Sequence, residues 1–284
     1  MWRVWWVVVG ALTLVVVEAA KLNEKQTKPR CQDMEGRQRK VCYERNRGYT
    51  ALMYAIDRNT TEVFDILLRA GSIVNAVSAK GLTPLYLAVD LGNEYIVDKL
   101  LQKGADPNTV STTGVTPLHA ATYWGHQNVV EFLLEKGADP NLQEKDGFSV
   151  LHKAVYYNFP SIVDIFIEKG SRVDSQNKKG HTALIHAAEG GHTVLVDKLL
   201  KAKANPNLQD TSGKTALHWA VLKQEKEVVR SLLKACADLT IQDNRGRTVK
   251  DLAKVVRVKN KDEDLKKKVE IIKLLADHNV ASCS

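Results

Sequence analysis

Seven glycines stand at an equal spacing of 33 residues along this 284-residue chain. They are Gly48, Gly81, Gly114, Gly147, Gly180, Gly213 and Gly246. A fixed period of this length indicates that one supersecondary unit is repeated, and that each unit covers the apolar face of its neighbour. The spacing therefore argues against a single irregular core and predicts a linear array of similar units.

The residues that follow these glycines recur as well. Four segments share a Thr-Pro-Leu or Thr-Ala-Leu step, namely Gly81–Ala88, Gly114–Ala121, Gly180–Ala187 and Gly213–Ala220. Further along the units stands an apolar pair, at Leu67-Leu68, Leu100-Leu101, Leu133-Leu134, Phe166-Ile167, Leu199-Leu200 and Leu232-Leu233. Gly-Ala-Asp-Pro-Asn closes two of the units, at Gly104–Asn108 and Gly137–Asn141.

Each unit contains the signals of two short helices. In the third unit, Thr116 suits an N-cap, and Pro117 suits the first helical turn, where its missing N–H costs nothing. The second helix has an apolar stripe at helical spacing, formed by Val129, Val130, Leu133 and Leu134. Gly137 then predicts a left-handed helix end. Lys203 and Cys236 occupy that same position in later units, and we expect a more strained helix end there.

The period and the Thr-Pro-Leu-His-x-Ala signature of Thr116–Ala121 resemble the ankyrin-repeat family. This resemblance implies an all-α solenoid of seven 33-residue helix–turn–helix units with β-hairpin-type loops. The expected units are residues 48–80, 81–113, 114–146, 147–179, 180–212 and 213–245, followed by a degenerate capping unit at 246–284. In that last unit the Leu274-Leu275 pair comes about nine residues late, so we place an insertion around Val258–Lys268 and expect a long final helix.

Residues 1–19 have the pattern of a secretory signal peptide: a basic start at Arg3, an uncharged run and small residues at Ala19 and Ala20. Cleavage is expected after Ala19, or alternatively after Ala20. The uncharged run of 14 residues covers only about 21 Å as a helix, which is too short for an uncleaved membrane anchor. Residues 20–47 then form a basic flank, and we expect a secreted, extracellular protein.

Cysteine usage is consistent with that route. The chain has four cysteines, Cys31, Cys42, Cys236 and Cys283, which permit three pairings. We expect Cys31–Cys42 and Cys236–Cys283, one disulfide at each end; four free thiols are the alternative if the chain is not exported. Asn59-Thr-Thr61 is a glycosylation motif in the turn between the two helices of the first unit.

No catalytic constellation is recognisable. His119, His152 and His218 share one position of their units, where the family resemblance implies a structural histidine that bonds neighbouring backbone. His126 and His192, in the turns between helices, are interpreted in the same way. Nucleophile, phosphate-loop and zinc-ligand motifs are missing from the sequence. We therefore predict no enzyme activity, no cofactor and no metal ion.

The resemblance places partner contacts on the hairpin tips and on the exposed side of each first helix, which form a concave surface in this family. These positions hold Leu82, Leu91, Val115, Tyr123, Trp124, Phe148, Tyr156 and Tyr157, which we expect to lie side by side. Trp124 and Tyr157 are the strongest candidates, whereas Phe148 and Tyr156 are the most prone to fold back onto the stack. The flanks are mostly basic, with Arg58, Lys80, Lys178, Lys179, Lys214, Lys223 and Arg245.

We predict a secreted, non-catalytic, monomeric scaffold that binds a protein partner, for example as a venom, salivary or effector-type protein. The net charge of +8 resides in the two ends, where Lys and Arg outnumber Asp and Glu by nine to four in residues 21–47. One alternative is therefore a binder of acidic polymers or membranes through the basic termini. A second alternative is an adaptor resident in the secretory pathway. Specific nucleic-acid binding is not expected.

Overall fold

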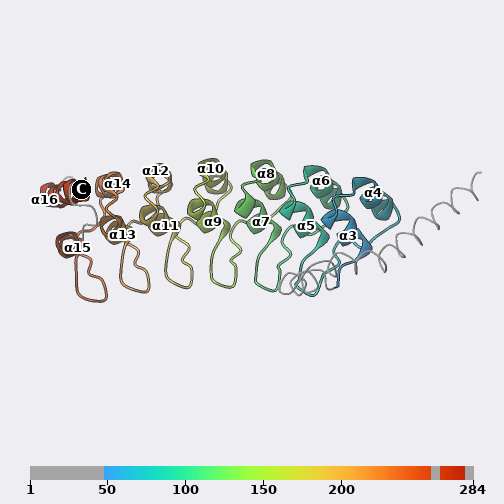
Figure 1. The fold of residues 1–284 in the computed structure, drawn as a ribbon, viewed down its shortest axis with the longest axis horizontal. Helices are drawn as coiled ribbons and strands as arrows, with labels where there is room; N and C mark the ends of the chain where they lie inside the picture. The colour runs from blue at the N-terminus through green and yellow to red at the C-terminus, as the bar shows by residue number, and fades with distance from the viewer. Residues whose placement is uncertain (1–47, 257–262, 279–284) are drawn as a thin grey trace, which may run out of the picture. The chain divides into compact units, whose positions relative to one another are not determined.

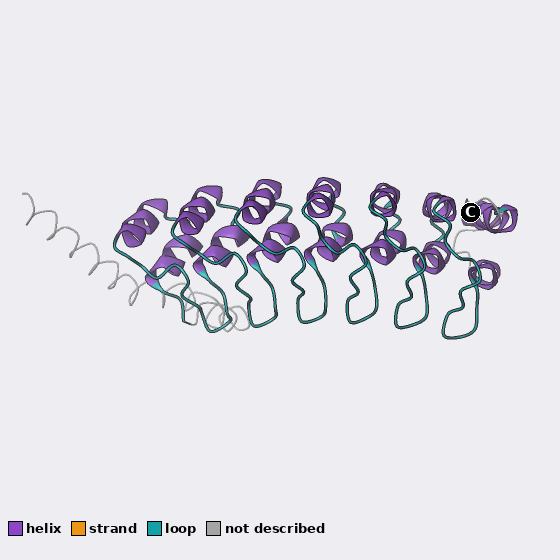
Figure 2. Ribbon diagram, turned by 180° about the vertical axis from the view of Figure 1, so that it is seen from behind, coloured by secondary structure: helices purple, strands orange, loops and turns teal. Residues whose placement is uncertain are grey.

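The computed structural model describes residues 48–256 and 263–278, with side chains from residue 265 onward in the last segment. These residues form α-helices joined by turns and long loops, and no strand occurs among them (Figures 1 and 2). The all-helical repeat fold predicted from the sequence is confirmed. The predicted signal peptide, the basic flank with Cys31 and Cys42, and Cys283 lie outside the described residues.

The helices alternate between two kinds. The first helices of the repeats are α3 (Ala51–Asp57), α5 (Pro84–Asp90), α7 (Pro117–Trp124), α9 (Val150–Tyr156), α11 (Ala183–Glu189), α13 (Ala216–Lys223) and α15 (Val249–Val255). The second helices are α4 (Thr61–Arg69), α6 (Glu94–Gln102), α8 (Gln127–Glu135), α10 (Pro160–Glu168), α12 (Thr193–Lys201), α14 (Lys226–Lys234) and α16 (Glu263–Asp277).

The chain divides into two compact units, of which the first ends at Trp124 and also includes Glu135–Ala138. In this unit α5 packs against α3, α6 and α7. The second unit contains Gly125–Leu134 and the chain from Asp139 onward. In the second unit α11 packs against α9, α12 and α13, and α12 contacts α10 and α14, so that first and second helices form separate rows (Figure 1).

A hydroxyl side chain begins most of the first helices. Thr83 accepts a hydrogen bond from the backbone N–H of Tyr86 at 3.2 Å, and Pro84 then occupies the first turn. Equivalent caps are made by Thr50, Ser149, Thr182, Thr215 and Thr248. Such a cap satisfies one of the free N–H groups at a helix start and is worth about 1 kcal/mol.

The core is a repeated set of apolar side chains. The first six repeat glycines are each followed four residues later by a leucine, and this leucine is buried at Leu52, Leu85, Leu118, Leu151, Leu184 and Leu217. The first member of the apolar pair in the second helix is buried at Leu67, Leu100, Leu133, Phe166, Leu199 and Leu232. Burying one such side chain contributes about 1.5–3 kcal/mol, so the periodic leucines account for much of the stability of the array.

The long loops are hairpin-like. Within one loop the N–H of Asn177 donates to the carbonyl of His181, and the same bond joins Asp210 to Lys214 one repeat later. Successive loops are also bonded, since the N–H of Thr211 donates to the carbonyl of Lys179 at 3.0 Å. These bonds fix the residues that flank each repeat glycine with respect to those of the next repeat.

Two second helices end at unusual residues. Gly137 and Gly170 adopt the left-handed conformation at this position, with φ of 88° and 79°. Lys203 and Cys236 adopt it too, at 64° and 59°, although an L side chain destabilises this conformation. The strained helix ends predicted from the sequence are therefore present.

The last described helix differs in length from the other second helices. α16 has 15 residues where the others have nine, as the displaced Leu274-Leu275 pair predicted. Ile271 and Leu275 are buried, and Glu270 pairs with Lys226 of α14 at 2.6 Å. The remaining face of α16 exposes charged residues together with Leu265, Val269 and Ile272.

Candidate functional site

Two aromatic side chains at the end of α7 are exposed. Tyr123 has 49% and Trp124 has 53% of its surface accessible, and their ring centroids lie 4.9 Å apart in an edge-to-face arrangement. The indole N–H of Trp124 donates to a carboxylate oxygen of Asp90 at 2.8 Å. The indole is thus held against the end of α5 while much of its surface remains in solvent.

Three apolar residues of the same unit belong to the predicted surface. Leu91, the C-cap residue of α5, is 43% exposed and follows Asp90 directly in the chain. Leu82 and Val115 are half-buried, and their carbonyls accept the hairpin bonds from Ser78 and Ser111. Leu91 therefore offers more accessible apolar surface than the two loop residues.

The second unit presents another aromatic group. Tyr156, at the end of α9, is 60% exposed, whereas Tyr157 and Phe148 are half-buried. The rings of Tyr156 and Tyr157 lie 5.2 Å apart, and Phe148 stacks on His186 at 5.5 Å. Tyr156 is thus more accessible than Tyr157, the reverse of the order expected from the sequence, and the ring of Tyr157 lies 6.2 Å from that of Phe159.

The predicted side-by-side arrangement of all eight residues spans both units, so it stays a prediction. Within each unit the structure places an aromatic pair at the end of a first helix, with both rings exposed in the first unit and only Tyr156 exposed in the second. The position nine residues after the repeat glycine is therefore exposed in both of these repeats, whereas the position ten residues after it is exposed only at Trp124.

The predicted basic residues of the second unit are found in the loops and helices of its later repeats. Lys178 and Lys179 are exposed in the loop before α11, and Arg245 is exposed in the loop before α15. Lys214 and Lys223 place their amines 5.1 and 6.0 Å from the centre of the Trp219 ring. Both amines are thus within cation–π distance of one aromatic ring.

The repeat histidines have the structural role that the sequence indicated. His152 accepts a hydrogen bond from the backbone N–H of Ser149 through Nδ1, and its Nε2 lies 2.9 Å from the carbonyl oxygen of His181. The backbone N–H groups of Thr116 and Thr215 likewise donate to Nδ1 of His119 and His218. Burial lowers the pKa of His152 to about 4, so its ring is neutral at neutral pH.

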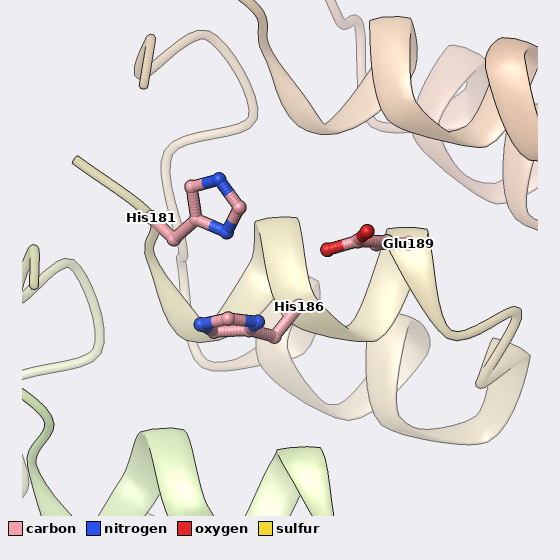
Figure 3. Close-up of side chains that lie close together, drawn as sticks. All are labelled: His181, His186 and Glu189. Carbon is pink, nitrogen blue, oxygen red and sulfur yellow. The ribbon is translucent and has the colours of Figure 1, made fainter. Parts of the chain in front are cut away.

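A group that the sequence interpretation missed lies in the fifth repeat. His181 and the α11 residues His186 and Glu189 each direct a potential ligand atom into one space, and these atoms lie within 4.8 Å of one another (Figure 3). The spacing of His186 and Glu189 by three helical residues was the available signal. This spacing alone did not indicate a cluster, because the third member, His181, precedes the helix and its orientation depends on the conformation of the loop.

Two predicted modification sites fall partly within the described residues. Asn59 is exposed at positive φ in the turn before α4, and its side-chain oxygen Oδ1 accepts a hydrogen bond from the side-chain amide of Asn93. Cys236 is disulfide-bonded, and its partner lies outside the described residues. Among the described helices, we find none with the length and apolar character needed to cross a bilayer.

Comparison with known proteins identifies the repeat. A family model described as "Ankyrin repeats (3 copies)" matches residues 19–111 and 151–243, and one described as "Ankyrin repeat" matches residues 113–145. The chain is similar to the crystal structure of the ankyrin repeat domain of Bcl-3, which is described as a unique member of the IkappaB protein family. The identity is 26% and the TM-score 0.68, over 80% of this chain and 99% of that one. A search of curated proteins found no match.

Proposed function

The chain belongs to the ankyrin-repeat family, and from that premise we propose that it is a secreted, non-catalytic scaffold for a protein partner. Binding would use the exposed side chains at the ends of the first helices. Ankyrin repeats mediate protein interactions, and the side chains at their solvent-facing positions decide which partner fits.

The exposure of Trp124 carries this proposal. The equivalent position holds Arg58, Leu91, Tyr157, Gly190 and Lys223 in other repeats, so the fold does not require a large ring there. An exposed tryptophan beside a tyrosine and a leucine is typical of a binding hot spot. The hydrogen bond to Asp90 holds the indole in one orientation, which lowers the entropy lost when a partner binds.

The second unit supports the same function through different residues. Tyr156 offers an exposed ring, while Lys178 and Lys179 supply positive charge. Interfaces commonly combine an aromatic centre with a polar rim, where charges guide encounter more than they add affinity. We therefore propose a partner with an apolar anchor and acidic edges.

Secretion is the second part of the proposal. The signal-peptide pattern of residues 1–19 supports it, as does the disulfide at Cys236, since disulfides persist mainly in oxidising compartments. We propose the pairs Cys236–Cys283 and Cys31–Cys42, and a glycan on Asn59. The protein is proposed to act as a monomer, because a final capping unit, α15 and α16, covers the repeat before it.

To test the binding proposal, the wild-type protein and two variants that each lack one aromatic ring are used to capture partners from extracellular fluid, and the captured proteins are compared. Trp124→Ala removes the proposed hot spot. Tyr95→Ala is the matched control, since Tyr95 is 46% exposed on the second helix α6 of the same unit. We expect a captured protein to be lost with Trp124→Ala and retained with Tyr95→Ala, while both variants melt close to wild type.

Equal capture by both variants would contradict the proposed surface. A Trp124→Ala variant that mainly unfolds would assign this ring to the core instead. Binding that disappears with rising salt and is indifferent to Trp124 would favour the alternative, in which basic segments hold an acidic polymer.

A further inference from the structure

The fifth repeat brings together two imidazoles and a carboxylate, which are potential metal ligands. None of these side chains belongs to the proposed binding surface. His186 and Glu189 lie one helical turn apart on α11, so their side chains share a face of that helix. His181 enters from the loop before the helix, and its ring centroid lies 4.9 Å from that of His186. Figure 3 shows both imidazoles and the carboxylate turned toward one common space.

His181 has a buried nitrogen without a hydrogen-bond partner. Only 9% of the residue is exposed, and its Nδ1 is buried and unsatisfied. Buried polar atoms are nearly always hydrogen-bonded, so an unsatisfied one indicates a missing ligand or strain. Nε2 points away from this space toward Asp210, which leaves Nδ1 on the side of His186 and Glu189 (Figure 3).

The surroundings of His181 resemble the outer shell of a metal ligand. Its Nε2 lies 3.4 Å from a carboxylate oxygen of Asp210. Asp210 is itself fixed by the backbone N–H groups of Ser212 and Lys214 and by the indole N–H of Trp219. A carboxylate on one imidazole nitrogen keeps the proton there and leaves the other nitrogen unprotonated, as metal-bound histidines require.

His186 is held in place by rings on several sides. Phe148 stacks on it at 5.5 Å, and Tyr156 contacts it edge-on at 6.0 Å. Burial, together with the nearby histidines and Lys179, lowers the pKa of His186 to about 3, so the ring is neutral at neutral pH. Its Nε2 lies 3.3 Å from the side-chain nitrogen of Asn177, so Nδ1 is the ring nitrogen that faces His181 and Glu189 (Figure 3).

Glu189 supplies the acidic donor and the opening to solvent. Its side chain is partly exposed, and one carboxylate oxygen lies 3.3 Å from the amine of Lys223. Lys223 is itself exposed, so its flexible side chain can move aside without disturbing the core. An ion can therefore reach the two imidazoles past this ion pair.

We propose that His181, His186 and Glu189 form a zinc-binding site with one coordination position open to solvent. Two imidazoles and a carboxylate are a common zinc donor set, with a water molecule in the fourth position. Bonds of 2.0–2.2 Å in a tetrahedron bring the donors to about 3.3 Å from one another, so side chains now within 4.8 Å close inward on binding.

The test is direct titration of the untagged, chelator-treated full mature chain with Zn²⁺ alone. We expect one equivalent to bind in competition with a chromophoric chelator, and Co²⁺ to give the visible absorption of a tetrahedral complex. His186→Ala should weaken binding by about 100-fold or more, since losing an outer-shell partner alone typically costs 10–100-fold. Glu189→Gln, which keeps the size of the side chain, should weaken it as well.

His126→Ala is the matched control, because it removes a histidine from the turn before α8, outside the cluster. It should bind zinc as the wild type does. Imidazole NMR signals of His181 and His186 should shift on zinc addition, which localises the ion without any variant. Affinity equal in wild type, His186→Ala and His126→Ala, or less than one equivalent bound, would overturn the proposal. Partner capture through Trp124 is a separate readout, so either proposal can fail alone.

Discussion

Individual buried histidines make the free energy of unfolding of the array depend on pH. His218 is fully buried behind Thr215, and burial lowers its pKa below the ordinary value of 6.5. The folded chain therefore keeps this ring neutral at pH values where the unfolded chain binds a proton. Unfolding takes up that proton, so the free energy of unfolding falls as the pH drops below about 6.5.

We predict that His218→Gln flattens this pH dependence. The variant loses its cap contact and is less stable at pH 7, but its free energy of unfolding should decline less between pH 7 and pH 5. The difference in slope is at most about 1.4 kcal/mol per pH unit for a single group. Chemical denaturation at several pH values measures it, and parallel curves for the two proteins would contradict a neutral His218.

The left-handed helix ends allow a second test on single residues. Lys203 adopts a φ of 64°, which costs an L residue about 1–2 kcal/mol, whereas glycine adopts it freely but loses more entropy on folding. We predict that Lys203→Gly stabilises the protein by up to about 1 kcal/mol. Gly170→Lys is the reverse control. An added Cβ at this position has no atom within 4 Å, so the substitution changes the conformational energy of the backbone without creating a clash. A loss of stability in Lys203→Gly would show that the lysine side chain matters more than its backbone.

At the scale of elements, the repeat glycine allows the backbones of neighbouring loops to approach closely. A Cβ on Gly180 would lie 2.8 Å from the backbone nitrogen of Thr211 in the following loop. That nitrogen donates to the carbonyl of Lys179, so the two loops are bonded at the point of closest approach. The 33-residue glycine period is therefore a requirement of neighbouring loops.

Gly180→Ala should consequently destabilise the protein more than Gly170→Ala does. Both substitutions place an L residue at positive φ, but only the first forces a backbone contact that cannot relax by side-chain rotation. We expect Gly180→Ala to exceed the roughly 1–2 kcal/mol conformational cost of the control. Thermal melts of both variants measure the difference, and equal losses would mean that the loops separate without cost.

The helices were predictable from sequence because each repeats the same local signals. Thr116 and Pro117 mark the start of α7, and the displaced Leu274-Leu275 pair indicated the longer α16. The positions of individual rings were less predictable. Tyr156 and Tyr157 are adjacent and chemically identical, and the structure brings the ring of Tyr157 to 6.2 Å from that of Phe159 while Tyr156 stays exposed. The His181 cluster depends on a loop conformation that no periodicity encodes.

For the whole molecule, a repeated scaffold separates folding from recognition. The periodic leucines, caps and glycines recur in nearly every repeat, whereas Trp124, Tyr156 and the fifth-repeat cluster each occur once. Variation that is confined to solvent-facing positions can change the partner without changing the fold. The proposed export adds oxidised ends to that scaffold, with the disulfide of Cys236 at the close of the sixth repeat.

The central claim is that this ankyrin array acts outside the cell that makes it, and one measurement tests it most directly. The full-length gene is expressed in a eukaryotic secretory host, and the intact mass of the product is determined with and without reduction. We predict a product in the medium that begins at Ala20 or Lys21 and gains two hydrogens for each of two disulfides on reduction. A product retained in the cell, with Met1 present and thiols free, would contradict the account.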